Sequence, residues 1–591
     1  MKLLGISSGF HDAAAALVVD GRVVAAVEEE RLSRVKHDPA FPERAIDTCL
    51  AIAELSPGDL DVVTFHEKPL GVVQRIVATR LRSGPRGVPA LLTTTPTAIA
   101  DQLSVGHRIH RYFRRRGVRT PAVHYAEHHS SHAAAAFYPS PFTSAAVLTV
   151  DGVGEWATAS MGDGHGHKLR LDRELRFPDS VGLLYSAFTA YCGFRVNSGE
   201  GELMGLAPYG EPRFRDLILE ELVDVAPDGS PSLDQRYFAY LHGRRTINRR
   251  FEQLLGAPTR RPEEPLTRRH ADVAASIQAV TEEVVLAMAR TAQRESGSTN
   301  LCLAGGVALN CVANGRLLRE GPFEQLWIQP AAGDAGNAIG AALHTWHHTL
   351  GNRREPDGTD GMAGGFLGPW FDRDEIEAWL AAEGIGHLAV ADDEERCARV
   401  AERIRDGAVV GWCCGRMEFG PRALGHRSIL ADPRSPDVQG RVNRLVKERA
   451  TFRPFAPAVL ADRAGEWFDL AGPSPYMLLT AQVRAERRRE VGPADDPDDL
   501  EAIVAQCRSE IPAVTHVDGS ARVQTVDVAT NPEFSRLLGA FDRLTGCPVL
   551  LNTSFNARDE PIVCTPDDAY RTFRRIGLDL LVLEHCLVER S

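Results

Sequence analysis

Lysine is scarce in this chain of 591 residues. Only five of its 67 basic residues are lysines, and all the others are arginines. The five are Lys2, Lys36, Lys68, Lys168 and Lys447. Such a skew is typical of arginine-rich codon usage in a GC-rich genome. A lysine that persists inside a motif is therefore informative, whereas a single arginine is weak evidence outside one.

Other absences exclude several classes of protein. No run of about 18 uncharged apolar residues is present, so we expect no spanning helix and no membrane partner. The N-terminal apolar run is too short for a secretory signal. The 11 cysteines form no C-x-x-C pair, which predicts reduced thiols in a cytoplasmic protein. A net charge of −12 argues against a nucleic-acid partner, because phosphate contacts need a basic surface.

The length predicts more than one domain. Hydrophobic residues make up 43% of the chain and charged residues 25%, as in ordinary globular proteins. A polar, glycine-rich stretch at 351–365 is typical of a linker. We therefore expect domains at 1–355 and 356–591. Residues 67–116 are predicted to be an arginine-rich helical excursion of the first domain, and 485–501 an exposed insertion.

A strand–turn–strand pattern occurs twice in the predicted first domain. Residues 3–7 predict a strand, and 13–19 and 22–28 predict a hairpin closed by Asp20-Gly21. Residues 147–150 and 157–161 repeat this order around a second Asp-Gly turn. The repeat indicates a duplicated α/β domain like that of acetate kinase, sugar kinases, heat-shock proteins and actin. The alternative is coincidence, because strand–turn–strand patterns are common.

Two histidines suggest a metal site. His128 and His132 are four residues apart, so on a helix both face one side. Asp151, after the repeated strand, and Asp334, in a glycine-rich loop, are the candidate carboxylate ligands. Two imidazoles and two carboxylates suit iron, manganese or zinc. The alternative is a structural role, with hydrogen-bonded histidines at a helix N-terminus.

A second cluster of polar residues lies in the predicted C-terminal domain. Arginines in glycine-broken loops suit bidentate capture of phosphate oxygens, and a lysine adds a point charge. The sequence has no P-loop, so that class of kinase is not supported. The candidates are Arg422, Lys447, Arg453, Arg522, Asn552 and Ser554. The alternative for each arginine is a solvated surface charge.

Two further residues follow the first turn and the first hairpin of the duplicated fold. His11 comes after the first strand, and Lys36 comes after the hairpin. Both are expected to point into the cleft between the two halves. A lone histidine would more often have a structural role.

Together these segments resemble the O-carbamoyltransferase family of antibiotic and nodulation-factor biosynthesis, the NodU/CmcH type. The resemblance covers nearly the whole chain, with the motifs in order. They are GISSGFHDAAAAL, EEERLSRVKHD, EHHSSHAAAAFYPSPF, GEGELMGLAPYG, AGGVALNCVANG, GDAGNAIGAA, GRMEFGPRALGHRSILADP, KERATFRPFAPAV and LNTSFNARDEPIV.

The resemblance implies a two-step reaction in an actin-like N-terminal domain and a YrdC-like α/β C-terminal domain. The second domain would make carbamoyl adenylate from carbamoyl phosphate and ATP, with Mg²⁺ accompanying the nucleotide. The first would transfer the carbamoyl group to a hydroxyl of a small-molecule acceptor. The family match makes His128, His132, Asp151 and Asp334 ligands of Fe(II) or a similar divalent ion.

The same resemblance implies roles for the remaining candidates. His11 would orient the acceptor or take its proton, and Lys36 would stabilise the developing oxyanion. Gly305, Gly306 and Asn310 would approach the nucleotide. Glu202 stands where many relatives are expected to have lysine, which leaves any phosphate-binding role there in doubt.

Two other functions stay open from the sequence. One is a tRNA threonylcarbamoyl-type modifying enzyme, and the other is a non-catalytic nucleotide-binding scaffold. The sequence identifies neither the acceptor nor the oligomeric state. Segments 67–116 and 485–520 are our candidates for acceptor contacts.

Overall fold

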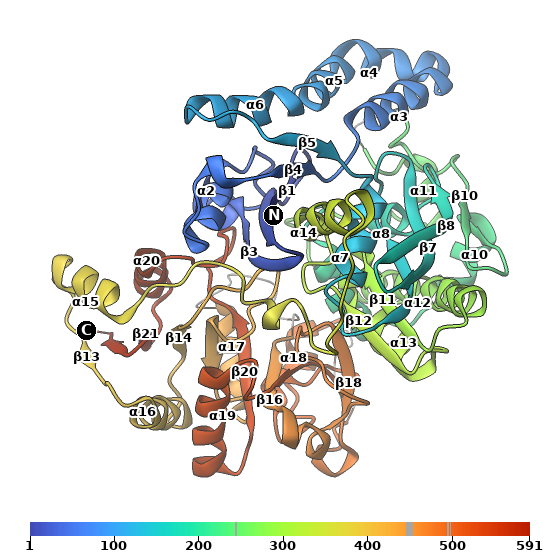
Figure 1. Ribbon diagram of the computed structural model, residues 1–591. Helices are drawn as coiled ribbons and strands as arrows, with labels where there is room; N and C mark the ends of the chain where they lie inside the picture. Colours follow the sequence, from blue (N-terminus) through green and yellow to red (C-terminus); the bar gives the residue numbers. More distant parts are fainter. Residues whose placement is uncertain (243–244, 445–451, 453, 493–495, 497, 591) are drawn as a thin grey trace. The chain divides into compact units, whose positions relative to one another are not determined.

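The chain folds as two units in a computed structural model (Figure 1). The structure describes residues 1–590 except 243–244, 445–451, 453, 493–495 and 497. The first unit consists of Met1–Glu29 and Asp38–Gly361, and the second of Glu30–His37 and Met362–Ser591. The two units are described separately below. The division at 355/356 stays a prediction about domains.

The first sheet begins with the hairpin that the sequence predicts. Asp20 and Gly21 both have positive φ angles, +49° and +83°, as a tight hairpin turn requires. The strand order is β3-β2-β1-β4-β5; β1 pairs antiparallel with β2 and parallel with β4. The strands are β1 (Lys2–Ser7), β2 (Ala14–Val19), β3 (Arg22–Glu28), β4 (Val62–Phe65) and β5 (Ala122–Tyr125).

The second sheet of this unit repeats the first. Its order is β8-β7-β6-β11-β12; β6 pairs antiparallel with β7 and parallel with β11. The strands are β6 (Ser144–Val150), β7 (Ala157–His165), β8 (Lys168–Arg176), β11 (Asn300–Ala304) and β12 (Gln325–Ile328). Order and direction match strand by strand, so the predicted duplication is confirmed and coincidence is excluded.

Two short helices pack between these sheets with their backbones unusually close. They are α7 (His128–Phe137) and α14 (Asn337–His344). A Cβ on Gly340 of α14 would overlap the carbonyl oxygen of Ser131 in α7, and one on Gly5 would overlap that of Ala338. Glycine is thus required at both crossings.

We expect Gly340→Ala to destabilise the first unit by about 2 kcal/mol or more, because the added methyl group cannot fit beside Ser131. The control is Gly201→Ala in α9 (Glu200–Leu206), where a Cβ meets nothing within 4 Å. Alanine is the better helix former, so this control should be neutral or slightly stabilising. Urea denaturation followed by circular dichroism measures both. Equal stability of the two variants would contradict the close-packing argument.

The other elements of the first unit surround these layers. The predicted excursion at 67–116 is helical, and Figure 1 shows it as the blue segment above the first sheet. The remaining elements are α2 (Glu43–Ile52), α3 (Pro69–Arg82), α4 (Val88–Thr93), α5 (Thr95–Leu103), α6 (Val105–Arg115), α8 (Val181–Tyr191), α10 (Arg215–Glu221), β9 (Val223–Val225), β10 (Pro231–Leu233), α11 (Arg249–Leu254), α12 (Arg268–Ser296) and α13 (Cys311–Glu320).

The second unit is built on one mixed sheet. Its order is β13-β22-β21-β14-β15-β20-β16-β19-β18-β17. The bounds are β13 (Leu388–Ala389), β14 (Val410–Cys413), β15 (Arg427–Ala431), β16 (Ala456–Leu460), β17 (Phe468–Asp469), β18 (Leu479–Val483), β19 (Ser520–Val526), β20 (Val549–Ser554), β21 (Leu580–Leu583) and β22 (Cys586–Glu589).

Six α-helices accompany this sheet among the described residues from 362 to 590. They are α15 (Arg373–Ala382), α16 (Asp393–Arg405), α17 (Pro436–Val442), α18 (Leu500–Ala505), α19 (Pro532–Thr545) and α20 (Pro566–Ile576). Helices α16 and α19 pack on each other, and fully buried Trp412 lies in the core. The chain is therefore of mixed α/β class, while the YrdC-like assignment of this unit stays a prediction.

A short early segment belongs to the second unit, which the sequence did not indicate. It comprises Glu30–His37 and most of α1 (Glu29–Ser33). Arg31 donates to the carbonyl of Gly420 at 2.8 Å, and Arg34 donates to the carbonyl of Ile562 at 2.7 Å. These bonds join positions several hundred residues apart, beyond the reach of any local pattern.

Two absences can be checked directly. Among the described residues, no helix is long and apolar enough to cross a membrane. All eleven cysteines are free thiols, and ten of them are buried.

Candidate functional site

Four residues predicted as metal ligands come together in the first unit. His128 and His132 occupy the first turns of α7, Asp151 follows β6, and Asp334 opens the short 3-10 turn before α14. Each offers one ligand atom within 4.8 Å of the others, and all four side chains are buried. Strand ends and helix starts thus converge between the two repeated sheets.

The distances among these atoms fit a common ion. The two Nε2 atoms lie 3.1 Å apart, and His128 Nε2 lies 3.3 Å from Asp151 and 3.5 Å from Asp334. His132 Nε2 lies 3.7 Å from Asp334 and 4.0 Å from Asp151. Ligands about 2.1 Å from one ion lie about 3.0 Å apart at right angles and about 3.4 Å apart at tetrahedral angles. The donor set therefore fits a divalent metal.

The charges also favour a cation. Burial disfavours the charged form of Asp151, but the hydrogen bond with His128 and the nearby imidazoles hold its pKa well below the usual range. Burial lowers the pKa of His128, yet Asp151 and Asp334 outweigh this and raise it to about 10. Two buried carboxylates thus stabilise positive charge at one point, and a metal ion held by these four residues would supply it in place of protons.

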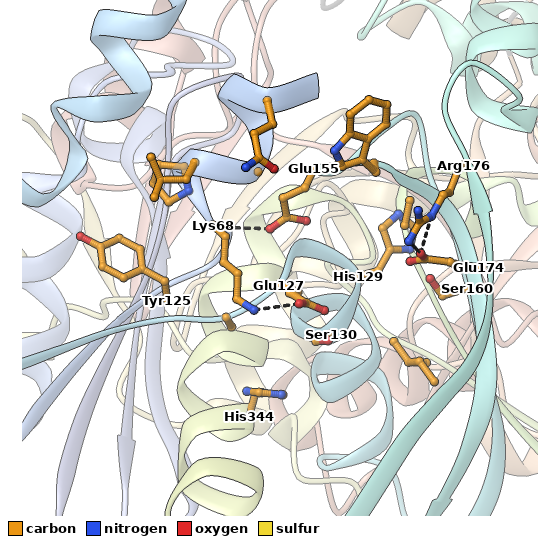
Figure 2. Close-up of a pocket in the computed structure, with 18 of the residues that line it drawn as sticks. Lys68, Tyr125, Glu127, His129, Ser130, Glu155, Ser160, Glu174, Arg176 and His344 are labelled. Atoms are coloured by element: carbon orange, nitrogen blue, oxygen red, sulfur yellow. Dashed lines mark hydrogen bonds and ion pairs between the residues drawn. The ribbon is translucent and has the colours of Figure 1, made fainter. Parts of the chain in front are cut away.

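Glu155 positions this site although the sequence did not single it out. Its carboxylate accepts hydrogen bonds from the backbone N–H of His128 at 3.1 Å and of Lys68 at 2.7 Å. The His128 N–H lies at the start of α7, and the Lys68 N–H directly precedes α3. The Glu155 carboxylate therefore caps both helices. The Lys68 ammonium pairs with Glu127 at 2.7 Å (Figure 2). The sequence signal that could have identified Glu155 is its place, as a carboxylate, in the turn of the second strand–turn–strand repeat.

Asn337 is a second residue that sequence reasoning missed. It is fully buried, and its Nδ2 lies 3.2 Å from His132 Nε2. Its Oδ1 has no hydrogen-bond partner in the described structure. A buried amide oxygen without a partner is unfavourable unless something else satisfies it. This orphaned oxygen agrees with a cation beside it.

His11 also lies at this site. Its Nδ1 contacts Asp12 at 2.9 Å, and its Nε2 lies 3.8 Å from Asp334. Burial lowers its pKa, but the Asp12 hydrogen bond and Asp334 raise it to about 9. His11 is predicted to point into the cleft between the two halves, and these distances place it beside the candidate metal ligands. Its catalytic role stays a prediction.

The glycine loop has close contacts of its own. Gly305 has φ +92°, and a Cβ there would overlap the backbone of Val150. The Gly306 N–H donates to Asp151 Oδ1 at 2.8 Å. Asn310 caps α13 through Ala313 N–H. These glycines bring the loop against β6 and fix Asp151; their predicted approach to a nucleotide stays a prediction.

A large cavity lies beside the metal-binding residues. It has a volume of about 1350 Å³ and runs between the helical excursion and β8 (Figure 2). Its walls include Lys68, Tyr125, Glu127, His129, Glu155, Trp156 and His344. His129 directly follows His128, a candidate metal ligand at the start of α7. The cavity therefore borders α7 on the side that carries His129.

The arginine loop of the second unit is organised by a buried glutamate. Glu418 Oε1 accepts hydrogen bonds from the backbone N–H groups of Leu424, His426 and Arg427, at 2.8, 2.8 and 3.1 Å. Arg427 is fully buried and donates to backbone carbonyls, including that of Gly415 at 2.9 Å. The loop carrying Arg422 is thus rigidly held.

Asn552 joins this loop to the sheet. It is fully buried on β20, and its Nδ2 donates to the Ala423 carbonyl at 3.2 Å and to Gln524 at 2.8 Å. Ser554 donates to Asn556 at 2.6 Å. Asn552 therefore positions the loop. This structural role is an alternative to the predicted direct contact of Asn552 with ATP.

The other predicted residues of this unit are placed as follows. Arg422 lies in the organised loop and Arg522 on β19, two strands from β20. Lys447 and Arg453 lie outside the described residues. Lys36 is exposed in the early segment that belongs to this unit. Their binding or catalytic roles stay predictions, as does the significance of Glu202, which lies on α9 of the first unit.

Comparisons with known families match both parts of the chain. The family description "Carbamoyltransferase N-terminus" fits residues 2–343, and "Carbamoyltransferase C-terminus" fits residues 401–590. A crystal structure of component A of (R)-2-hydroxyglutaryl-CoA dehydratase from Acidaminococcus fermentans is 15% identical. It covers 58% of this chain and 97% of that chain with a TM-score of 0.32, which is too low to carry an argument.

Three curated relatives align over nearly the whole chain. "Uncharacterized protein sll1178" of Synechocystis sp. is 52% identical, covering 100% of this chain and 97% of its own. "Nodulation protein NolNO" of Sinorhizobium fredii is 37% identical, covering 98% and 79%. "3'-hydroxymethylcephem-O-carbamoyltransferase" of Amycolatopsis lactamdurans is 27% identical, covering 98% and 98%.

Proposed function

The chain belongs to the carbamoyltransferase family, and from this we propose that it transfers a carbamoyl group to a hydroxyl of a small-molecule acceptor in an ATP-dependent reaction. The observation that carries the proposal is the buried cluster of two histidines and two aspartates in a unit that matches the family's N-terminal part. A relative whose name includes O-carbamoyltransferase supports oxygen as the accepting atom.

The first step assigned to the second unit forms carbamoyl adenylate. Carbamoyl phosphate, ATP and water give carbamoyl adenylate, phosphate and pyrophosphate, with Mg²⁺ bound to the nucleotide. The binding residues are Arg422, Lys447, Arg453, Arg522, Asn552 and Ser554. Arginine forks and an ammonium group would neutralise the charge that shifts onto phosphate oxygens. The rigid loop held by Glu418 would keep the Arg422 fork in place.

The second step belongs to the first unit. The acceptor oxygen bonds to the carbamoyl carbon, the bond from that carbon to the AMP oxygen breaks, and AMP leaves. His11 orients the acceptor hydroxyl or takes its proton, with Asp12 orienting the His11 ring. Lys36, the predicted stabiliser of the oxyanion, lies in the segment Glu30–His37 and therefore not in the first unit. His128, His132, Asp151 and Asp334 would hold Fe(II) or a similar divalent ion, which supplies Lewis acidity.

The cavity beside α7 is the proposed acceptor site. It is large enough for a sizeable small molecule and borders Glu155, which fixes the start of α7. Tyr125 and Trp156 offer flat apolar surfaces, while Glu127 and Lys68 offer polar contacts. Such mixed linings suit hydroxylated organic ligands.

The decisive experiment incubates the full chain with carbamoyl phosphate, ATP and Mg²⁺ and measures pyrophosphate and AMP. Pyrophosphate release without acceptor would support the adenylate step, and its absence with every divalent metal tested would overturn the proposal. Acceptors are sought in cell extracts by a mass increase of about 43 Da, the exchange of H for CONH₂. Tight, salt-sensitive tRNA binding with tRNA modification would instead support the tRNA enzyme.

Removal of the metal should separate the two steps. We expect chelation, followed by gel filtration into buffer with Mg²⁺, to stop carbamoyl transfer and to leave pyrophosphate formation within about twofold, because the donor cluster lies wholly in the first unit. Metal content by plasma mass spectrometry accompanies the rates. Restored transfer on adding back Fe(II), but not Mg²⁺ alone, completes the test.

A further inference from the structure

The helical excursion has a charge opposite to that of the rest of the chain. Residues 68–121 contain eleven basic residues and one acidic residue, Asp101, whereas the whole chain has a net charge of −12. Between 68 and 100 no acidic residue occurs at all. A strongly basic segment in an acidic protein attracts negatively charged partners.

Exposed apolar side chains concentrate in the same segment. Five of the fifteen large apolar side chains that are exposed among the described residues lie between positions 70 and 103. Scattered exposed leucines need no explanation, but a cluster on a basic element does. The five are Leu70 (66%), Leu81 (65%), Val88 (47%), Leu92 (73%) and Leu103 (55%).

Some of these residues have other roles. Leu70 and Leu103 line the cavity beside α7. Arg116 pairs with Asp47 and stacks on Tyr112, so that its charge is partly neutralised. Leu81, Arg82, Val88 and Leu92 remain at the junction of α3 and α4, all of them exposed. We call these four residues the tip patch.

The turn that carries the tip patch is firmly built. A Cβ on Gly87 would overlap the carbonyl oxygen of Arg80, so the chain folds back tightly there. Arg80 Nη1 donates to the Leu241 carbonyl at 2.6 Å, and Ser83 Oγ donates to the same oxygen at 3.2 Å. The leucines are therefore held outward by packed backbone, which lowers the entropy lost on docking.

We propose that the tip patch docks onto a bilayer containing anionic lipids. This proposal replaces the expectation of no membrane partner, which rested on the lack of a spanning helix and does not bear on peripheral docking. Leu81, Val88 and Leu92 would enter the boundary between headgroups and acyl chains, and Arg82 would meet lipid phosphates. Three exposed apolar side chains beside Arg82 favour a bilayer over nucleic acid, because a nucleic acid attracts arginine but offers apolar side chains no apolar layer to enter. Such docking would give the enzyme access to acceptors held at a membrane.

The test is co-sedimentation of the full chain with vesicles. One set contains phosphatidylcholine alone, and the other contains added phosphatidylglycerol. We expect binding to the anionic vesicles at least about tenfold tighter, weakening as salt rises. Leu81→Asp and Leu92→Asp should each weaken that binding about tenfold or more, because an aspartate is both polar and repelled. Arg82→Glu should reduce the preference for anionic vesicles.

A matched control is Leu544→Asp, which changes an exposed leucine on α19 of the second unit. It should bind vesicles like the wild type, and pyrophosphate release should be unchanged in every variant. Equal binding by all variants, or no binding to anionic vesicles, overturns the proposal. RNA retention lost in Arg82→Glu but kept in Leu92→Asp would indicate nucleic acid instead. A dimer broken only by the leucine substitutions would indicate a second copy.

Discussion

Asp151→Ala will lower carbamoyl transfer by about 10³-fold or more while pyrophosphate formation stays close to wild type. Asp151 supplies one of four buried donor atoms and is fixed by the Gly306 N–H at 2.8 Å. Its loss leaves His128, His132 and Asp334 with one carboxylate fewer, so the affinity for a divalent ion falls. The proposed adenylate-forming residues lie in the other unit and are untouched.

Asp151→Asn separates charge from shape. The amide oxygen can still accept the Gly306 hydrogen bond, but it lacks the charge that binds a cation. Both variants should therefore lose transfer and bound metal together. Asp224→Ala, at an exposed position on β9, is the matched control. Rates of transfer and of pyrophosphate release, with metal content, are measured on the same preparations. Loss of pyrophosphate release in both variants would contradict the division into two sites.

The sequence could predict that the four candidate metal ligands come together, because local rules govern the placement of each of them. His128 and His132 share a helix face by spacing alone. Asp151 follows a strand that repeats the first strand of the chain, and Asp334 stands in a glycine loop before a helix. The two sheets have the same strand order. The segments that follow equivalent strands of the two sheets therefore come together at this site.

The residues that the sequence missed act over long sequence distances. Glu155 caps a helix 27 residues earlier in the chain, and Arg31 bonds to Gly420 across 389 residues. No periodicity reports such contacts, and the repeated turn that carries Glu155 does not indicate which helix its carboxylate caps. Asn552 shows a subtler limit. The sequence proposes it as an ATP-binding residue, but its amide donates to the Ala423 carbonyl and to Gln524. A polar residue in a motif can serve the backbone as well as a ligand.

The scarcity of lysine was only partly useful for choosing candidate site residues. Lys36 and Lys447 drew attention because arginine is the usual basic residue of this chain. Yet the motif-free Lys68 also has a defined environment, since its ammonium pairs with Glu127 at the cavity wall and its N–H is held by Glu155. Composition therefore identified candidates without ranking them. Only the folded chain shows which of the four described lysines lines a cavity, namely Lys68.

Arg422→Ala will lower pyrophosphate release and overall carbamoylation together, by about 10²-fold or more. Arg422 lies in the loop whose backbone is held by Glu418 and by the Asn552 side chain. A fork of N–H donors on a rigid loop can stabilise charge on a phosphate without reorganising during the reaction. Because carbamoyl adenylate feeds the transfer step, losing its formation stops both measured outputs.

Arg422→Lys tests the geometry of that contact. Lysine keeps the charge but not the planar fork, so we expect partial recovery, with pyrophosphate release between those of the wild type and Arg422→Ala. Arg571→Ala, which removes an exposed arginine from α20, should be unaffected. Bound metal should stay at the wild-type level in all three variants, since the donor cluster belongs to the first unit. Normal pyrophosphate release by Arg422→Ala would remove this residue from the proposed ATP site. It would leave Arg522 and the predicted Lys447 and Arg453 as the phosphate-binding charges to test next.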